Sequence, residues 1–320
     1  MASFSIDTMI NGGSQHASIP LSGAEWTTYR ETKAAQLKFK YPRDCGVHLE
    51  EGQLLAFMID GQKAFQGFVF KNDSSMDDLI DVTAYTQMRY LQNQATYLFE
   101  QKTLPDIIRM VAEDVAIVVG SLSGSSTPID LISEENKIVD ILDEARAIAM
   151  DKEGRLYQIW DDRGKLCLSR LPDDRMLPYR IGDYSLLYNY DYKRTIDDDT
   201  YNRVVLYKKD EKTGKYIVVK ADDPDNTAKW GVLQHFEMAD EKMSEGEMQA
   251  KADAILSMRN SVKRELTLEA IGILECEAGC SIHVSIEQEG LSGFALINKA
   301  VHRFEGKGSH TMKLTMNMVR

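Results

Sequence analysis

The residues best able to do chemistry in this 320-residue chain are six histidines and four cysteines, and their spacing does not favour catalysis. None of the histidines has a partner at metal-ligand spacing, and the Gly-x-Ser-x-Gly motif of an esterase nucleophile is absent. His302 and His310 could come close across a hairpin, where we expect a structural role. The remaining histidines are scattered: His16, His48, His235 and His283.

Metal and phosphate sites are also poorly supported by the spacing of the residues. Cys276 and Cys280 are separated by three residues without nearby histidines, so they predict buried or half-buried thiols, as do the isolated Cys45 and Cys167. The acidic segments 197–199 and 222–226 lack the Gly and distal Glu of a calcium loop, which favours solvated loops. Residues 12–14 (GGS) are too short for a phosphate loop and predict a turn. We therefore expect no catalytic residue, cofactor site or metal site.

A run of tyrosines is the one cluster that points to binding. Tyr188, Tyr190 and Tyr192 share one face of an expected strand. Tyrosine is enriched at protein interfaces, so these three are our candidate interface residues. They could equally cover the inner wall of a barrel, and the sequence does not decide between the two interpretations.

Composition limits the function classes. The chain carries 38 Lys+Arg against 50 Asp+Glu, a net charge of −12, which argues against wrapping of nucleic acid by clustered cations. An acidic surface could repel DNA if it lined a channel, although simple solubility explains it as well. No basic and apolar leader and no apolar run of 18 residues is present, so we expect assembly in the cytoplasm without a membrane span.

Alternating residues indicate that most of the chain is β-structure. In residues 310–318, Met312, Leu314, Met316 and Met318 face one way, while Thr, Lys and Asn residues face the other. Similar short runs occupy 266–272, 280–286 and 294–301 near the C-terminus, and 36–41, 54–59, 65–70 and 79–84 near the N-terminus. Asp60-Gly61 between two apolar runs predicts a hairpin.

Three domains follow from the order of these patterns. Residues 1–86 predict a first β-barrel domain, residues 87–180 a small α+β domain, and residues 181–320 a second β-barrel domain. Apolar spacing predicts helices at 104–116 and 137–150 in the middle domain, followed by strands at 156–160 and 166–169. Ser244 and Glu247 fit a capping box, which places a helix at about 244–262 inside the last domain. The predicted class is α+β, mainly β.

Several segments occur in a characteristic order over nearly the full chain. They are 67–70 (GFVF), 80–91 (IDVTAYTQMRYL), the helix at 104–116, 201–204 (YNRV), 230–234 (WGVLQ), 264–272 (RELTLEAIG), 293–304 (GFALINKAVHRF) and 310–314 (HTMKL). In these segments and their order the chain resembles the hub proteins of phage-like tail elements in Gram-positive bacteria, the XkdQ/YqbQ family. In one place the chain departs from that family, with Glu277-Ala278-Gly279-Cys280 at a turn, which should alter that turn and not the fold.

The resemblance implies a structural, non-enzymatic role. Hubs of contractile tails are trimers whose subunits hold two tail-tube-like barrels, so three chains present six barrels to a sixfold tube and three copies to a central spike. The implied partners are the tail tube, central spike, tape-measure and baseplate wedge proteins, in the baseplate of a phage or a phage-tail-like bacteriocin. The sequence does not say which of these particles it belongs to.

Two other classes of function fit the sequence less well than the hub. A carbohydrate- or surface-binding β-module would concentrate its aromatic platform, whereas Trp26, Trp160 and Trp230 lie in three different predicted domains. A tail-associated peptidoglycan hydrolase would need a catalytic segment, and the three domains use the whole length without an obvious Glu/Asp pair. A glycan array would separate the binding module from the hub.

Overall fold

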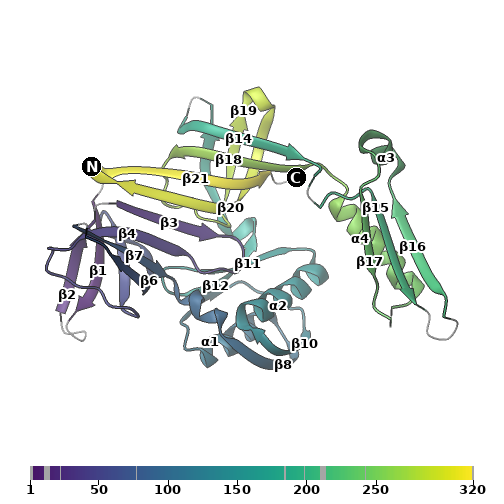
Figure 1. Ribbon diagram of the computed structural model, residues 1–320, viewed down its shortest axis with the longest axis horizontal. Coiled ribbons are helices and arrows are strands. Elements are labelled where there is room, and N and C mark those ends of the chain that lie inside the picture. The colour runs from purple at the N-terminus through teal and green to yellow at the C-terminus, as the bar shows by residue number, and fades with distance from the viewer. Residues whose placement is uncertain are drawn as a thin grey trace. The chain divides into compact units, whose positions relative to one another are not determined.

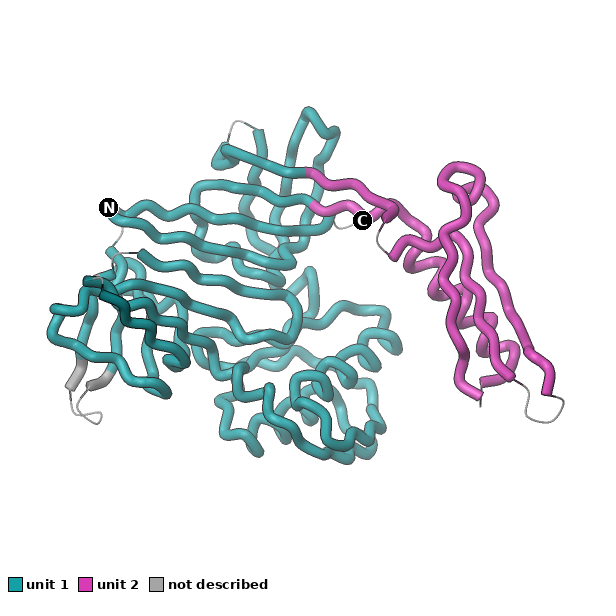
Figure 2. Tube along the Cα trace, in the orientation of Figure 1, with its two compact units in different colours: residues 1–191, 266–320 teal, residues 192–265 magenta. Residues whose placement is uncertain are grey.

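Strands dominate the chain: 53% of the residues lie in strands and 21% in helices, which confirms the prediction of a mainly β member of the α+β class. The computed structural model describes residues 3–10, 15–21, 23–76, 78–183, 185–197, 199–209, 214–241 and 243–318. Two compact units are present (Figure 2). Unit 1 comprises residues 1–191 and 266–320, and unit 2 comprises residues 192–265.

The N-terminal strands of unit 1 are half-buried because their apolar residues alternate with polar ones. Leu37, Phe39 and Tyr41 are buried on one face, in a core shared with Phe57 and Phe65. Asp60 and Gly61 both have positive φ and form the predicted hairpin turn. The strands are β1 (Phe4–Ile10), β2 (Gln15–Pro20), β3 (Gly23–Tyr29), β4 (Gln36–Pro42), β5 (Leu54–Ile59), β6 (Gln62–Ser74) and β7 (Leu79–Tyr85).

The C-terminal strands complete the main sheet of unit 1. On the last strand Met312, Leu314 and Met316 are buried, as the alternation predicts, and Leu314 lies opposite Leu268. These strands are β13 (Met176–Gly182), β14 (Leu187–Thr195), β18 (Lys263–Ile271), β19 (Ser281–Ile286), β20 (Leu291–Glu305) and β21 (Ser309–Met318), with the 3-10 turns η3 (Glu287–Glu289) and η4 (Gly306–Gly308).

One long strand, β20, joins the two groups of strands. Its N-terminal part pairs with β19, and its C-terminal part pairs antiparallel with β3 from Lys299↔Tyr29 to Glu305↔Gly23. In Figure 1 the purple β3 therefore lies beside the yellow-green β20, although the two are far apart in sequence. The pairing order is β14-β18-β21-β20-β3-β4-β7-β6-β5-β1-β2, with β19 and β13 branching from β20.

The two halves thus share one sheet. Among the described residues, the path of pairings runs from β14 to β2 without returning on itself. Two separate closed barrels are not what these pairings show, because half of β20 hydrogen-bonds to the N-terminal group. The tube-like barrel form and the three domain boundaries stay predictions.

A smaller α+β part of unit 1 has its own apolar core. Its helices are where the apolar spacing predicts them, and Thr103 caps the first by accepting a hydrogen bond from the Asp106 N–H at 3.4 Å. Gly154, in the left-handed region, ends the second. The elements are η1 (Gln87–Gln92), β8 (Gln94–Lys102), α1 (Leu104–Asp114), β9 (Val119–Leu122), β10 (Ile129–Lys137), α2 (Ile138–Glu153), β11 (Leu156–Asp161), β12 (Leu166–Leu171) and η2 (Asp173–Arg175).

Unit 2 is a three-stranded sheet with a helix on one face. The predicted capping box of Ser244 and Glu247 starts its long helix, which buries Met248 and Ala252 against Val204 and Leu206. Its first two strands, β15 and β16, pair antiparallel, and residues 210–213 between them lie outside the described residues. The elements are β15 (Arg203–Lys209), β16 (Tyr216–Asp222), α3 (Pro224–Trp230), β17 (Gln234–Met238) and α4 (Glu245–Arg259).

The short helix α3 corrects one expectation. Residues 222–226 were expected to form a solvated acidic loop. Instead the Asp223 carboxylate accepts a hydrogen bond from the Asn226 N–H at 3.0 Å and Pro224 occupies the first helical position, so the segment starts a helix. The predicted helix at 244–262 is confirmed as α4, and it belongs to unit 2.

Candidate interaction surfaces

The exposed face of the main sheet is polar and carries charges in cross-strand pairs. Glu269 on β18 pairs with Lys313 on β21 at 3.0 Å, and Arg303 on β20 pairs with Glu25 on β3 at 3.1 Å. Further along, Lys40 on β4 pairs with Asp81 on β7. Exposed pairs add little stability, but they leave a broad sheet face with both signs of charge interspersed. Such a charged, hydrated face favours contact with water over tight docking of another protein.

The tyrosine triplet lies on β14, which is at one end of the strand order. Tyr188 is 59% exposed, and the Tyr190 hydroxyl donates to Gln288 Oε1 at 3.1 Å and lies 3.3 Å from Glu289 Oε1. Desolvation and the neighbouring Glu289 raise the pKa of Tyr190. Tyr192 is half-buried. None of the three is fully buried, and their role as interface residues stays a prediction.

The two C-terminal histidines do meet across the β20–β21 hairpin. His302 Nδ1 lies 3.0 Å from His310 Nε2, and His302 Nε2 lies 3.1 Å from the Cys276 carbonyl oxygen. Burial lowers the pKa of His302 to about 3 and that of His310 to about 4, so both are neutral near pH 7. The His302 ring stacks on Trp26 at 5.2 Å. His302 is fully buried and His310 is partly buried, and both rings pack against Phe304, so the pair belongs to an aromatic cluster.

The other candidate ligands are already bonded within the protein. Asp199 faces Lys263 at 3.4 Å and Arg259 at 3.7 Å, while Asp198 lies outside the described residues. The His235 ring contacts Glu237 at 2.8 Å, a pairing that the spacing rules missed. Cys276 is buried, which raises its pKa to about 12. Within the described part of the chain, no three His, Cys, Asp or Glu side chains gather as metal ligands would.

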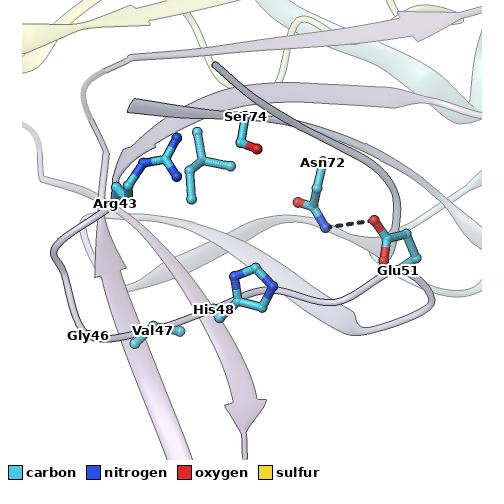
Figure 3. Close-up of a pocket in the computed structure, with 8 residues that line it drawn as sticks. Arg43, Gly46, Val47, His48, Glu51, Asn72 and Ser74 are labelled. Carbon is cyan, nitrogen blue, oxygen red and sulfur yellow. Dashed lines mark hydrogen bonds between the residues drawn. The ribbon is translucent and has the colours of Figure 1, made fainter. Parts of the chain in front are cut away.

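A shallow hollow lies beside the loop after β4 (Figure 3). Arg43 and His48 line it, but Arg43 donates to the Ser75 carbonyl at 2.6 Å. The Asn72 amide donates to the Leu49 carbonyl at 3.0 Å and to Glu51 at 3.3 Å. These bonds hold the loop on β6, so the hollow has the chemistry of a loop anchor.

The most unusual charges lie in a buried cluster around Arg175. Its guanidinium donates to Gln158 Oε1 at 2.9 Å and to the Ala278 carbonyl at 2.8 Å, and it lies 3.7 Å from the Glu277 carboxylate. The same group stacks 3.7 Å above the Trp160 ring. Burial raises the pKa of Glu277. The cluster holds η2, β11 and the loop before β19 together, which is a structural function.

A second buried acid, Asp161, gives a pH prediction. Its Oδ1 accepts the Gly164 N–H at 2.7 Å, while Oδ2, out of contact with solvent, has no partner among the described residues. Desolvation raises the pKa of Asp161 to about 7, above its value of about 3.9 in the unfolded chain. The unfolded state therefore ionises first, and wild-type stability should fall as the pH rises from about 4 to about 7.

Asp161→Asn should remove this dependence. We expect the variant to be more stable than wild type by on the order of 4 kcal/mol at pH 8, with little difference at pH 4. Urea unfolding at both pH values measures it. The informative quantity is the difference in unfolding free energy between wild type and variant. His302 and His310 have lowered pKa values, so in both proteins they make stability rise with pH below about pH 6.5, and this contribution cancels in the difference. Equal stabilities at pH 8 would show that Asp161 is ordinary and exposed.

The outward face of the unit 2 sheet is an apolar surface that our sequence reasoning missed. α4 packs on one face only, and the opposite face presents Tyr216, Val218, Phe236 and Met238, each more than half exposed. Tyr207 lies between them and stacks on Phe236 at 4.7 Å. The sequence shows the alternation of apolar residues at 216–218 and 236–238. It does not show which face of the sheet α4 covers.

The joined sheet, with the α+β part beside it, is the fold of phage tail proteins. The 43 kDa tail protein of prophage MuSo2 from Shewanella oneidensis is similar with a TM-score of 0.73 and 14% identity, over 99% of this chain and 98% of that one. The tail protein from Neisseria meningitidis MC58 has a TM-score of 0.71 and 14% identity, over 98% and 96% of the two chains.

Sequence comparison identifies the family. The chain belongs to the YQBQ-like family, whose profile matches residues 24–317. Phage-like element PBSX protein XkdQ from Bacillus subtilis (strain 168) is 30% identical over 271 residues, which cover 83% of this chain and 81% of that protein. The family resemblance predicted from the sequence is confirmed. None of the described helices is long and apolar enough to span a membrane.

Proposed function

We propose that this chain is the baseplate hub of a contractile tail, which joins a sixfold tail tube to a threefold central spike and starts tube assembly. It acts as a homotrimer without turnover. The observation that carries this proposal is the joined sheet, in which two groups of strands in one chain are connected by the β20–β3 pairing. Two similar groups per chain, repeated three times, would offer six neighbouring surfaces to a tube.

The polar sheet face supports the same role. If three copies surround a channel, a face with paired charges of both signs would line it without holding a passing polymer. The partners proposed from the family are the tube, central spike, tape-measure and baseplate wedge proteins. The particle, a phage or a phage-tail-like bacteriocin, would be assembled in the bacterial cytoplasm. Tyr188, Tyr190 and Tyr192 are proposed to contact a neighbouring protein in it.

The mass in solution tests the trimer. Light scattering of the purified chain across a range of concentrations should give three times 36.2 kDa, alone or after addition of the tube and spike proteins. A Tyr188→Ser variant should keep its fold, judged by circular dichroism, and lose binding to one of these proteins. A chain that stays monomeric and binds neither protein would contradict the hub, and binding on a glycan array would then support a surface-binding module.

A further inference from the structure

The outward face of the unit 2 sheet is a contiguous apolar surface, and its exposure to water would be unfavourable without a partner. Val218, Tyr207 and Met238 form one row across the three strands, and Val205 and Phe236 lie opposite each other in the next row. Tyr216 joins the patch at 6.1 Å from the Tyr207 ring. Soluble proteins rarely leave adjacent aromatic and aliphatic side chains exposed on several strands unless a partner covers them.

Cations stand at both ends of this patch. Arg203 and Lys209 are the first and last outward residues of β15. The Nε atom of Arg203 is buried and has no hydrogen-bond partner among the described residues. Lys220 lies opposite Val205 and forms an ion pair with Asp222 at 3.0 Å, and Asp222 lies opposite Arg203, so this end carries two cations and one carboxylate. A matching surface would therefore be apolar in the middle and acidic at both ends.

One surface of the same chain has that arrangement. On the two-stranded ribbon of β8 and β10, Leu98 and Ile132 lie directly opposite each other and are 59% and 70% exposed. The next outward residues along the two antiparallel strands are Glu100 and Glu134, both exposed, so an acid stands at each end of the pair. Residues 192–265 carry 14 Lys+Arg and 15 Asp+Glu, so nearly all of the net charge of −12 lies in unit 1, which holds this ribbon.

We infer that the outward face of the unit 2 sheet in one copy docks on the β8–β10 ribbon of a second copy. This inference rests on the proposed homotrimer and names one contact within it. The two surfaces differ, so the contact runs head to tail and can close into a ring of three. Two unit 2 faces meeting each other would instead oppose Arg203, Lys209 and Lys220 with the same cations, which disfavours that pairing.

Disulfide trapping between two singly substituted chains tests the contact. In a Cys45→Ser background, one chain carries Val218→Cys and the other Ile132→Cys, while the remaining native cysteines are buried. Mild oxidation of the mixture should give a covalent dimer on non-reducing gels, and neither chain alone should give one. A dimer from Val218→Cys alone would indicate face-to-face pairing and would overturn the inference, as would a mixture without any covalent dimer.

Self-association of single variants gives an independent measurement. Phe236→Ser should raise the dissociation constant for self-association by about tenfold or more, because it removes an aromatic from the centre of the contact. Met258→Ser is the matched control: it removes an exposed apolar residue of α4, away from this face, and should change nothing. Unchanged circular dichroism would show that both variants fold.

The outcomes separate this contact from the hub itself. A wild-type trimer that Phe236→Ser leaves intact would overturn the contact while the proposed hub stands. A wild-type chain that does not self-associate at its highest soluble concentration would overturn the contact too. The proposed hub function would be contradicted only if the chain also binds neither the tube protein nor the spike protein.

Discussion

Phe304→Ala should destabilise unit 1 by about 3–5 kcal/mol, the range for removing a fully buried aromatic ring. Phe304 lies on the C-terminal strand β20 but is fully buried in the core of the N-terminal strands. Its ring packs 5.1 Å from Phe4, 5.0 Å from Phe57 and 4.4 Å from His310. Urea unfolding measures the loss, and amide exchange in β1–β7 should accelerate although the substitution is far away in sequence.

The same substitution elsewhere on β20 provides the control. Phe294 is 41% exposed and faces His283 edge-on at 5.6 Å. Phe294→Ala should cost less than about 1.5 kcal/mol, because less surface returns to water and no closed cavity forms. Equal losses for the two variants, or unchanged exchange in β1–β7 for Phe304→Ala, would mean that the two groups of strands do not share a core.

Arg175→Ala should be the second large effect, at about 3–5 kcal/mol near pH 7. The substitution removes the hydrogen bonds to Gln158 and Ala278, the stacking on Trp160, and the nearer of two cations that face the buried Glu277. Arg163 at 3.9 Å is half-exposed and compensates only in part. Loss of the guanidinium above Trp160 should also change tryptophan fluorescence in the folded state.

A double substitution separates charge from packing. Glu277→Gln in the Arg175→Ala background should recover part of the loss, because a neutral amide costs less to bury than an unpaired carboxylate. The coupling is read from the cycle of four proteins by urea unfolding. Strictly additive losses would show that Glu277 does not depend on Arg175, and the cluster would then act by shape alone.

Local patterns were enough to predict most elements of the fold. The alternation that places Met312, Leu314 and Met316 on one face is a property of a few neighbouring residues, and so is the capping box at Ser244. The contact of His302 and His310 could be predicted for the same reason, because a hairpin joins them. The pairing of Lys299 with Tyr29 could not, because hydrogen bonds between backbones leave no mark on side-chain types.

The interaction surfaces were harder to predict than the strands. The apolar outward residues of unit 2 resemble core residues in the sequence, and only the position of α4 shows that they are uncovered. The strands β8 and β10 were missed because bulges interrupt their register and their acidic residues resemble a loop. Asp161 is the last residue of β11 and precedes a turn, where carboxylates are usually solvated, so nothing in the sequence indicated its burial.

The strands that lead into and out of unit 2, β14 and β18, are neighbours in the main sheet, and Asn189 bonds to Glu269 between them at 3.2 Å. A short turn could therefore connect these strands without altering the pairing order of the sheet. Insertions, deletions or replacement of the roughly 70 residues between these two strands would then leave the main sheet unchanged. The chain would thereby gain new contacts at this point at little cost to the sheet.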